Sequence, residues 1–126
     1  LCVGEDLIER QEGKALQYIE KQINDCLPDN FNDSLIAYEP IWSIGTGKIP
    51  SKSEIQEMHS HIKSVVYKIV KKRINVLYGG SVNTENINEI LKITNVDGVL
   101  VGGASLKAKD FLAIYSAAVK HLEASS

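Results

Sequence analysis

Three glycine-containing segments hold residue types that can bind a phosphate group. They are residues 39–50, 79–82 and 102–105. Glycine lets backbone N–H groups approach an oxyanion closely, and N–H groups near a helix start bind phosphate. Singly, each segment has an ordinary explanation, because a Gly–Gly pair after a strand is usually a tight turn, a Glu such as Glu39 usually faces solvent, and Trp42 can be a packing residue. The three segments in this order and spacing favour the chemical interpretation.

Four apolar runs would position these segments. The runs are residues 1–3, 35–38, 74–78 and 98–101. Their continuous apolar character predicts parallel strands that are buried on both faces. Because the first run begins at residue 1, we expect the chain to start within a strand.

The stretches between the runs show helical periodicity. One of them opens with a capping box, in which Glu54 stands three residues after Ser51. Its apolar stripe holds Ile55, Met58, Ile62, Val65, Val66 and Ile69. The other expected helices are marked by Ile8, Ala15, Ile19, Ile23 and Leu27, by Ile87, Ile90 and Leu91 within residues 84–92, and by Phe111, Ile114, Ala118 and Leu122 within residues 110–122.

Four strand–helix units predict an α/β fold with a parallel sheet. Periodicity leaves two versions open, a small open sheet and half of an eightfold barrel. In a barrel, all three glycine-containing segments would open at the C-terminal face, where active sites form. If the last two strands are the seventh and eighth of a barrel, residues 79–82 and 102–105 lie where barrels commonly bind phosphate.

Composition limits the classes of partner. The chain has 126 residues, enough for one domain with a modest core. A formal charge of −2, without a basic stripe that alternates with aromatics, argues against a nucleic-acid partner. No apolar run approaches the ~20 residues of a membrane span. Cys2 and Cys26 form neither a disulfide nor a zinc pattern, so we expect a reducing, cytoplasmic setting.

The glycine-containing segments and the first strand carry a specific resemblance. The sequences AYEPIWSIGTG at residues 37–47, YGGSV at 78–82 with Asn86 following, DGVLVGGASL at 97–106 and LCVGE at 1–5 resemble conserved blocks of the triosephosphate isomerase family. The resemblance covers essentially the whole chain. It implies that residues 1–126 form the C-terminal half of a TIM (β/α)8 barrel, four βα units that supply strands five to eight with their helices.

The resemblance implies an isomerase activity. The family interconverts dihydroxyacetone phosphate and glyceraldehyde 3-phosphate through an enediolate, in glycolysis and gluconeogenesis, without a metal or organic cofactor. Glu39 matches the carboxylate that moves a proton between adjacent substrate carbons, and Pro40 restricts the backbone beside it. The positions whose backbone N–H groups bind the substrate phosphate match Gly45, Ser81, Gly102 and Gly103.

Residues 40–50 match the lid that closes over the substrate in this family. Tyr78 and Ser81 match residues that hold the closed lid, and Glu5 matches a residue near Trp42, whose indole N–H would then have an acceptor. Ser43 and Pro50 depart from the commoner family residues, so we expect altered hinge kinetics without lost chemistry. The expected lid residues and lid contacts are Pro40, Ile41, Trp42, Ile44, Thr46, Gly47, Tyr78 and Glu5.

Part of the family's active site has no counterpart in this sequence. The family also uses a Lys and an Asn after its first strand and a neutral His after its fourth, and no residue here occupies those places. For His59, His61 and His121, which lie in expected helices, we expect surface or structural roles. The group that polarises the substrate carbonyl would then be absent, and we expect the chain alone to be inactive.

Two other hypotheses compete with the isomerase. A non-catalytic half-barrel would leave its sheet edges unpaired and would associate with another copy of itself or with the missing N-terminal half. A different phosphate-handling barrel enzyme, such as a sugar-phosphate isomerase of amino-acid biosynthesis, would share the phosphate loops, but residues 39–47 argue against it. For the whole enzyme, the resemblance implies a small phosphorylated triose as substrate and a homodimer as the assembly.

Overall fold

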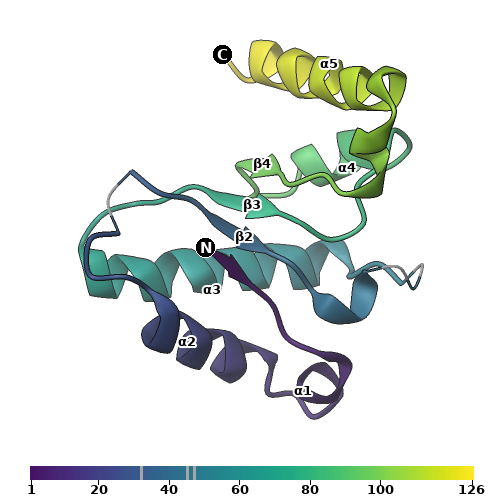
Figure 1. The fold of residues 1–126 in the computed structure, drawn as a ribbon. Helices are drawn as coiled ribbons and strands as arrows, with labels where there is room; N and C mark the ends of the chain where they lie inside the picture. The colour runs from purple at the N-terminus through teal and green to yellow at the C-terminus, as the bar shows by residue number, and fades with distance from the viewer. Residues whose placement is uncertain (32, 45, 47) are drawn as a thin grey trace.

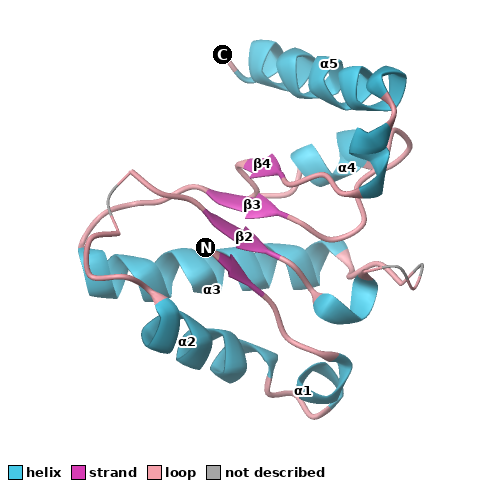
Figure 2. Ribbon diagram, viewed as in Figure 1, coloured by secondary structure: helices cyan, strands magenta, loops and turns pink. Residues whose placement is uncertain are grey.

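A parallel four-stranded sheet forms the centre of the chain in a computed structural model that describes residues 1–31, 33–44, 46 and 48–126. The strands are β1 (Cys2–Val3), β2 (Ile36–Tyr38), β3 (Val76–Tyr78) and β4 (Gly98–Val99), and they follow one another in this order across the sheet. Each neighbouring pair is parallel. Figure 2 shows the four strands side by side, joined by helices and loops.

Helices connect successive strands. α1 (Leu7–Gln11) and α2 (Ala15–Cys26) follow β1, α3 (Lys52–Val70) follows β2, α4 (Ile87–Leu91) follows β3, and α5 (Ala108–Ser125) follows β4. Two short 3₁₀ turns, η1 (Ile41–Ser43) and η2 (Gly103–Leu106), come directly after β2 and β4. α2 and α3 pack side by side next to the sheet, and α4 and α5 lie together at the β4 end (Figure 1). This is the predicted alternation of four βα units.

The two faces of the sheet differ in burial. Tyr38 and Tyr78 are in register, so they share a face, and both are fully buried. Leu35 and Leu100 stand at positions of the opposite face and are 46% and 40% exposed. The prediction that the strands are buried on both faces is confirmed for β2, whose three residues are all buried. It is wrong at Leu35 and Leu100, which lie just outside β2 and β4, because α3 packs against the other face, the one that carries Tyr38.

α3 is the helix that the sequence predicts best. Its capping box is confirmed, since Ser51 Oγ accepts from Glu54 N and Glu54 Oε1 accepts from Ser51 N, each at 3.1 Å. Ile69 is exposed although the sequence predicts it on the apolar stripe. It lies in the last turn of α3, which ends at Val70 and is capped by Lys71 in the left-handed conformation. The stripe residues that are buried are Ile55, Met58, Ile62, Val65 and Val66.

The apolar pattern misplaces parts of the other helices. The single helix expected from Ile8 onward is two helices, because Gly13 has a φ of +72° and breaks it, and Ile8 is exposed. α4 begins later than expected, since Asn83 Oδ1 accepts from the N–H groups of residues 85 and 86 and holds them in a turn. In α5, Ile114 is buried by packing against neighbouring elements, whereas two predicted inward residues, Phe111 and Leu122, are exposed.

Candidate active site

Glu39 follows β2 at the carboxyl end of the sheet. Its backbone N–H donates to Val3 O at 2.7 Å, which continues the parallel pairing with β1. A Cβ at Gly79 would lie 2.8 Å from Glu39 Cγ, so the Glu39 side chain extends across Gly79 of the neighbouring strand. Glycine at residue 79 leaves the space that this side chain occupies.

A cavity of about 600 Å³ opens beside Glu39 where β2, β3 and β4 end. Part of its wall is bare backbone, because a Cβ built at Gly102 or Gly103 would meet no atom within 4 Å. The volume lies in the range of small-molecule sites. The predicted Gly45 and Gly47 lie outside the described residues. The predicted site residues that line the cavity are Glu39, Ile44, Ser81, Gly102 and Gly103.

Protein contacts hold the loop after β3 at the cavity wall. Ser81 Oγ donates to Ser43 O at 3.2 Å, which joins this loop to η1. Asn86 Nδ2 donates to Ser81 O at 2.8 Å, and Asn86 Oδ1 accepts from Asn83 N at the same distance. A Cβ at Gly80 would lie 2.1 Å from the Tyr78 hydroxyl oxygen. The backbone of Ser81 is therefore fixed in place by neighbouring side chains.

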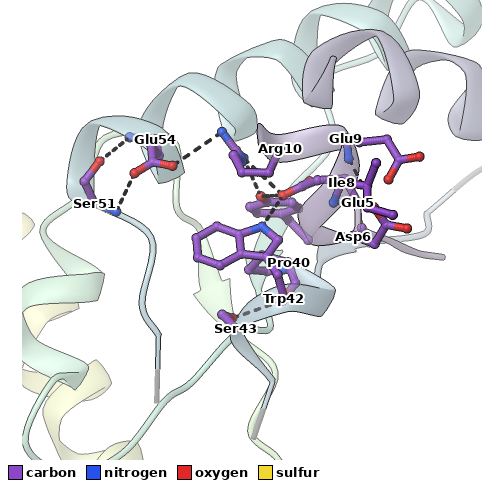
Figure 3. A network of polar contacts seen from close by, with 12 residues as sticks. Glu5, Asp6, Ile8, Glu9, Arg10, Pro40, Trp42, Ser43, Ser51 and Glu54 are labelled. Carbon is purple, nitrogen blue, oxygen red and sulfur yellow. Dashed lines mark hydrogen bonds and ion pairs between the residues drawn. The ribbon is translucent and has the colours of Figure 1, made fainter. Parts of the chain in front are cut away.

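A buried polar group lies on the helix-covered side of the same strands. Glu5 is fully buried, and its Oε1 accepts hydrogen bonds from Tyr38 Oη at 2.7 Å, Trp42 Nε1 at 2.9 Å and Arg10 Nη2 at 3.1 Å (Figure 3). Arg10 Nη2 also donates to Tyr38 Oη at 3.0 Å. The guanidinium carbon of Arg10 lies 5.7 Å from the centre of the Trp42 ring, within cation–π range. We call Glu5, Arg10, Tyr38 and Trp42 the Glu5 cluster.

The electrostatics of the Glu5 cluster favour a neutral phenol beside an ion pair. Burial raises the pKa of Tyr38, and the carboxylate of Glu5 raises it further, so the hydroxyl remains a hydrogen-bond donor. Burial acts to lower the pKa of Arg10, but electrostatic interactions and hydrogen bonds with Tyr38 and Glu5 outweigh it, and the pKa is raised. Breaking such a buried pair leaves a charge without compensation.

The described residues of the expected lid segment make local contacts. Thr46 Oγ1 donates to Trp42 O at 2.8 Å. Pro40 O accepts from Ser43 N at 2.9 Å and from Ser43 Oγ at 3.0 Å, so the serine at this position uses its hydroxyl to close η1. The exposed side chains of this segment include Ile41 and Ile44.

His59 of α3 is fully buried among aromatic rings, where a structural role, one of the two expected from the sequence, remains the prediction. Its ring centre lies 5.8 Å from that of Tyr38 and 6.3 Å from that of Tyr78. Nδ1 lies 3.1 Å from Asn95 O, and burial lowers the pKa of His59 to about 4. Burial also raises the pKa of Tyr78 to about 12, and the Ser43 hydroxyl opposes that rise. All three rings are therefore uncharged at neutral pH.

Sequence analysis missed Arg10 and Tyr38. Tyr38 belongs to the 37–47 block, but it appeared only as a strand residue. Its position next to Glu39 could have revealed this role, because neighbouring strand residues point to opposite faces of the sheet. If Glu39 faces the cavity, Tyr38 must face the other side, where the Glu5 cluster lies. Arg10 had no signal, since a charged residue on a five-residue helix usually faces solvent.

Two classes of site can be tested directly in the described part of the chain. There, no group of three or more His, Cys, Asp or Glu side chains could hold a metal ion. The described helices include none with the length and apolar character needed to cross a membrane. Both cysteines are free and exposed.

Comparison with known proteins adds an independent line of evidence. The profile of the family described as triosephosphate isomerase matches residues 1–118. A triosephosphate isomerase of Caulobacter vibrioides is 47% identical over 122 residues, which are 93% of this chain and 48% of that protein. That of Chelativorans sp. is 46% identical over 125 residues, 95% of this chain and 49% of that protein. The chain spans about half the length of the curated relatives it matches.

A solved structure extends the likeness to three dimensions. The crystal structure of triosephosphate isomerase from Bartonella henselae superposes with a TM-score of 0.82 at 38% sequence identity. The match covers 92% of this chain and 48% of that one. The four βα units thus correspond to part of a complete TIM barrel in sequence and in structure. The chain belongs to the triosephosphate isomerase family.

Proposed function

We propose that residues 1–126 are the C-terminal half of an enzyme that interconverts dihydroxyacetone phosphate and glyceraldehyde 3-phosphate, with Glu39 as its base. The observation that carries this proposal is the 600 Å³ cavity, which brings the Glu39 side chain beside bare glycine backbone from two loops. A base and an anion cradle within one small cavity suit a phosphorylated substrate.

The proposed reaction is a proton transfer between adjacent carbons. The Glu39 carboxylate takes a proton from one carbon of the triose, the C–H electron pair forms the enediolate, and the same carboxyl returns a proton to the neighbouring carbon. A second proton moves from the hydroxyl oxygen of the first carbon to the carbonyl oxygen of the second, a step assigned to the missing half of the barrel. Glu39 ends the cycle as it began, so the step needs no oxidant or reductant. Its place on β2, fixed by backbone pairing to Val3, gives the carboxylate a constant starting position.

We assign the substrate phosphate to backbone N–H groups at the cavity wall. The described donors are those of Ser81, Gly102 and Gly103, and the family resemblance adds Gly45. The absence of a Cβ at residues 102 and 103 would let the phosphate oxygens approach the backbone. Glycine at these two positions therefore serves the ligand and not the packing of the protein.

Residues 40–50 are assigned to a lid on the basis of the family resemblance. Ile44 lines the cavity and would cover the Glu39 carboxylate from the solvent side. Tyr78 and Ser81 lie under the start of this segment, and Ser81 Oγ already bonds to Ser43 O. The remaining members of the proposed lid and its contacts are Pro40, Ile41, Trp42, Thr46, Gly47 and Glu5.

The whole protein is proposed to be a cytoplasmic homodimer that acts in glycolysis and gluconeogenesis. The residues that polarise the substrate carbonyl in this family belong to the other half of the barrel, so the 126-residue chain alone is expected to lack turnover. The proposed reaction requires neither a metal nor an organic cofactor.

A coupled isomerase assay combined with intact-mass measurement tests this function. We expect no turnover from material of 13.9 kDa and full turnover from material about twice as heavy. Turnover by the 13.9 kDa chain itself would contradict the inactive half-barrel. A full-length protein that turns over neither triose phosphate would contradict the isomerase.

A second candidate function is self-association without catalysis. The exposed Leu35 and Leu100 on the uncovered sheet face favour it, because open apolar surface next to strand edges promotes pairing. Size-exclusion chromatography with light scattering on the 126-residue chain distinguishes the candidates. A stable dimer supports self-association, whereas a monomer that dimerises only with an N-terminal barrel half supports the first proposal.

A further inference from the structure

Arg10 contacts two carboxylates, those of Glu5 and Glu54. Glu5 accepts from Trp42 near the start of the 40–50 segment, and Glu54 accepts from Ser51 just after its end. At the first end, Arg10 Nη2 donates to Glu5 Oε1, the same oxygen that accepts the Trp42 indole N–H. At the second end, Arg10 Nη1 lies 3.5 Å from Glu54 Oε2. The other oxygen of Glu54 accepts the Ser51 N–H that starts α3. One guanidinium thus reaches the turn after Glu39 and the first turn of α3 (Figure 3).

The chemistry of arginine suits this double contact. A guanidinium presents several N–H donors in a planar fork, so it can bond two carboxylates at fixed angles, whereas a lysine ammonium acts as a single charged point. The side chain of Arg10 is 21% exposed and that of Glu5 is 0% exposed, so water and salt screen their attraction little. Contacts made by a half-buried fork are more constraining than those of an exposed ion pair.

We infer that Arg10 is a positioning residue that couples the two ends of the 40–50 segment, by holding Trp42 and the first turn of α3 to the buried carboxylate of Glu5. Movement at Glu54 changes the position of the guanidinium. Because Glu5 Oε1 is shared between Arg10 and the Trp42 indole, that change reaches Trp42. The two ends of the segment therefore respond together and not as independent hinges.

The coupling acts on catalysis through Glu39, which stands three residues before Trp42 in the chain. This consequence rests on the proposed isomerase function, whereas the coupling itself does not. The ordinary alternative is that the Arg10–Glu54 contact is a surface ion pair without effect on Trp42, as exposed pairs often are. The two possibilities differ in what a change at Glu54 does to the indole.

The indole N–H resonance of Trp42 provides a direct measurement. Full-length protein is labelled with ¹⁵N-tryptophan, and the Trp42 signal is assigned by its loss in Trp42→Phe. Three variants are compared, namely Arg10→Lys, Glu54→Gln and the control Lys52→Gln. Glu54→Gln keeps an acceptor for the capping box but removes the charge that faces Arg10. Lys52→Gln breaks a different ion pair of the same helix turn, the one with Glu89.

We expect Arg10→Lys and Glu54→Gln to shift the Trp42 indole resonance, and Lys52→Gln to leave it in place. Adding Glu54→Gln to Arg10→Lys should move the signal no further, because the connection is already broken. A Glu54→Gln spectrum identical to that of Lys52→Gln would overturn the inference. If Arg10→Lys fails to fold, Glu54→Gln alone still decides, because it changes a partly exposed side chain.

Steady-state kinetics separates this inference from the proposed function. In an active enzyme we expect Arg10→Lys and Glu54→Gln to lower kcat while KM for the triose phosphate stays constant, and Lys52→Gln to change neither. Equal kcat in all three variants would overturn the catalytic consequence. A wild-type protein without isomerase turnover would refute the proposed function and leave the resonance shifts as the test of coupling.

Discussion

The Glu5 cluster and the Glu39 cavity lie on opposite faces of the same strands and differ in how far the described chain completes them. In the cluster, Glu5 Oε1 already has three donors, and the side chain is fully buried. In the cavity, Gly102 and Gly103 have no atom within 4 Å of a built Cβ. In one region the chain's own side chains bury the carboxylate and fill the positions around Oε1, although Glu5 Oε2 and Arg10 Nε have no partner among the described residues, and the other region keeps open space beside a carboxylate.

This difference predicts whether a substitution lowers stability or turnover. A substitution in a closed, buried polar group leaves partners without compensation and lowers the free energy of unfolding. A substitution beside an open cavity meets few protein atoms, so it acts on the ligand and on turnover. Each of the following experiments sets one region against the other.

The largest expected effect is on turnover, at Glu39. Glu39→Asp withdraws the carboxylate by about one methylene, and general-base catalysis is typically worth 10²–10⁴-fold. We expect turnover of the assembled enzyme to fall by roughly a thousandfold, with the free energy of unfolding nearly unchanged. A coupled isomerase assay and urea unfolding measure both. Unchanged turnover would remove Glu39 as the base.

For Glu5 we expect the opposite result, a large loss of stability. Glu5→Gln leaves the half-buried guanidinium of Arg10 without its fully buried carboxylate partner, and breaking a buried pair costs about 3–5 kcal/mol. The control is Glu89→Gln, which removes an exposed carboxylate paired with Lys52 and Lys92 and should have little effect. Equal urea midpoints for the two variants would show that burial of the cluster contributes nothing to stability.

His59 should make the free energy of unfolding depend on pH. Its pKa falls from 6.5 in the unfolded chain to about 4 in the folded one, so the folded state binds fewer protons between these values and stability rises with pH through this window. The contribution is complete above pH 6.5 and is lost as pH falls toward 4, a change of about 3 kcal/mol.

The comparison of wild type with His59→Gln isolates this contribution from the titration of carboxylates. Urea unfolding at a series of pH values should give a shallower slope for the variant. Asp97 and Lys63 are the charged groups near His59, and they act on its pKa in opposite directions. Identical slopes in the two proteins would mean that His59 is not held neutral by burial.

The smallest expected effect is at the open wall of the cavity. Gly103→Val adds a side chain where a Cβ meets no protein atom, so stability should hold while inhibition by inorganic phosphate weakens by about tenfold, the equivalent of ~1.4 kcal/mol. Gly79→Ala is the matched glycine change, because its Cβ would lie 2.8 Å from Glu39 Cγ. We expect it to lower turnover by displacing Glu39.

Equal inhibition constants for wild type and Gly103→Val would count against the phosphate assignment. A Gly79→Ala variant with unchanged turnover would show that Glu39 adjusts to the added methyl group. Together the two glycine variants distinguish space kept for a ligand from space kept for a neighbouring side chain.

Much of the architecture was predictable because it depends on local patterns. The capping box of Ser51 and Glu54, most of the buried stripe of α3 and the four alternating strand–helix units follow from residue types at helical and strand spacing. The errors occur where packing decides. Phe111 and Leu122 are apolar and correctly spaced, yet they are exposed, because an apolar stripe is buried only where another element covers it.

The candidate site divides in the same way. The sequence by itself determined that a carboxylate at residue 39 begins the first of three glycine-containing segments, and its resemblance blocks identified the family. Only the tertiary structure decided that Gly79 makes room for Glu39 and that Arg10 joins Glu5 to Glu54. The physical reason is that these contacts link residues far apart in the chain or on separate elements. Their geometry depends on how the strands and helices pack, which no local spacing of residue types encodes.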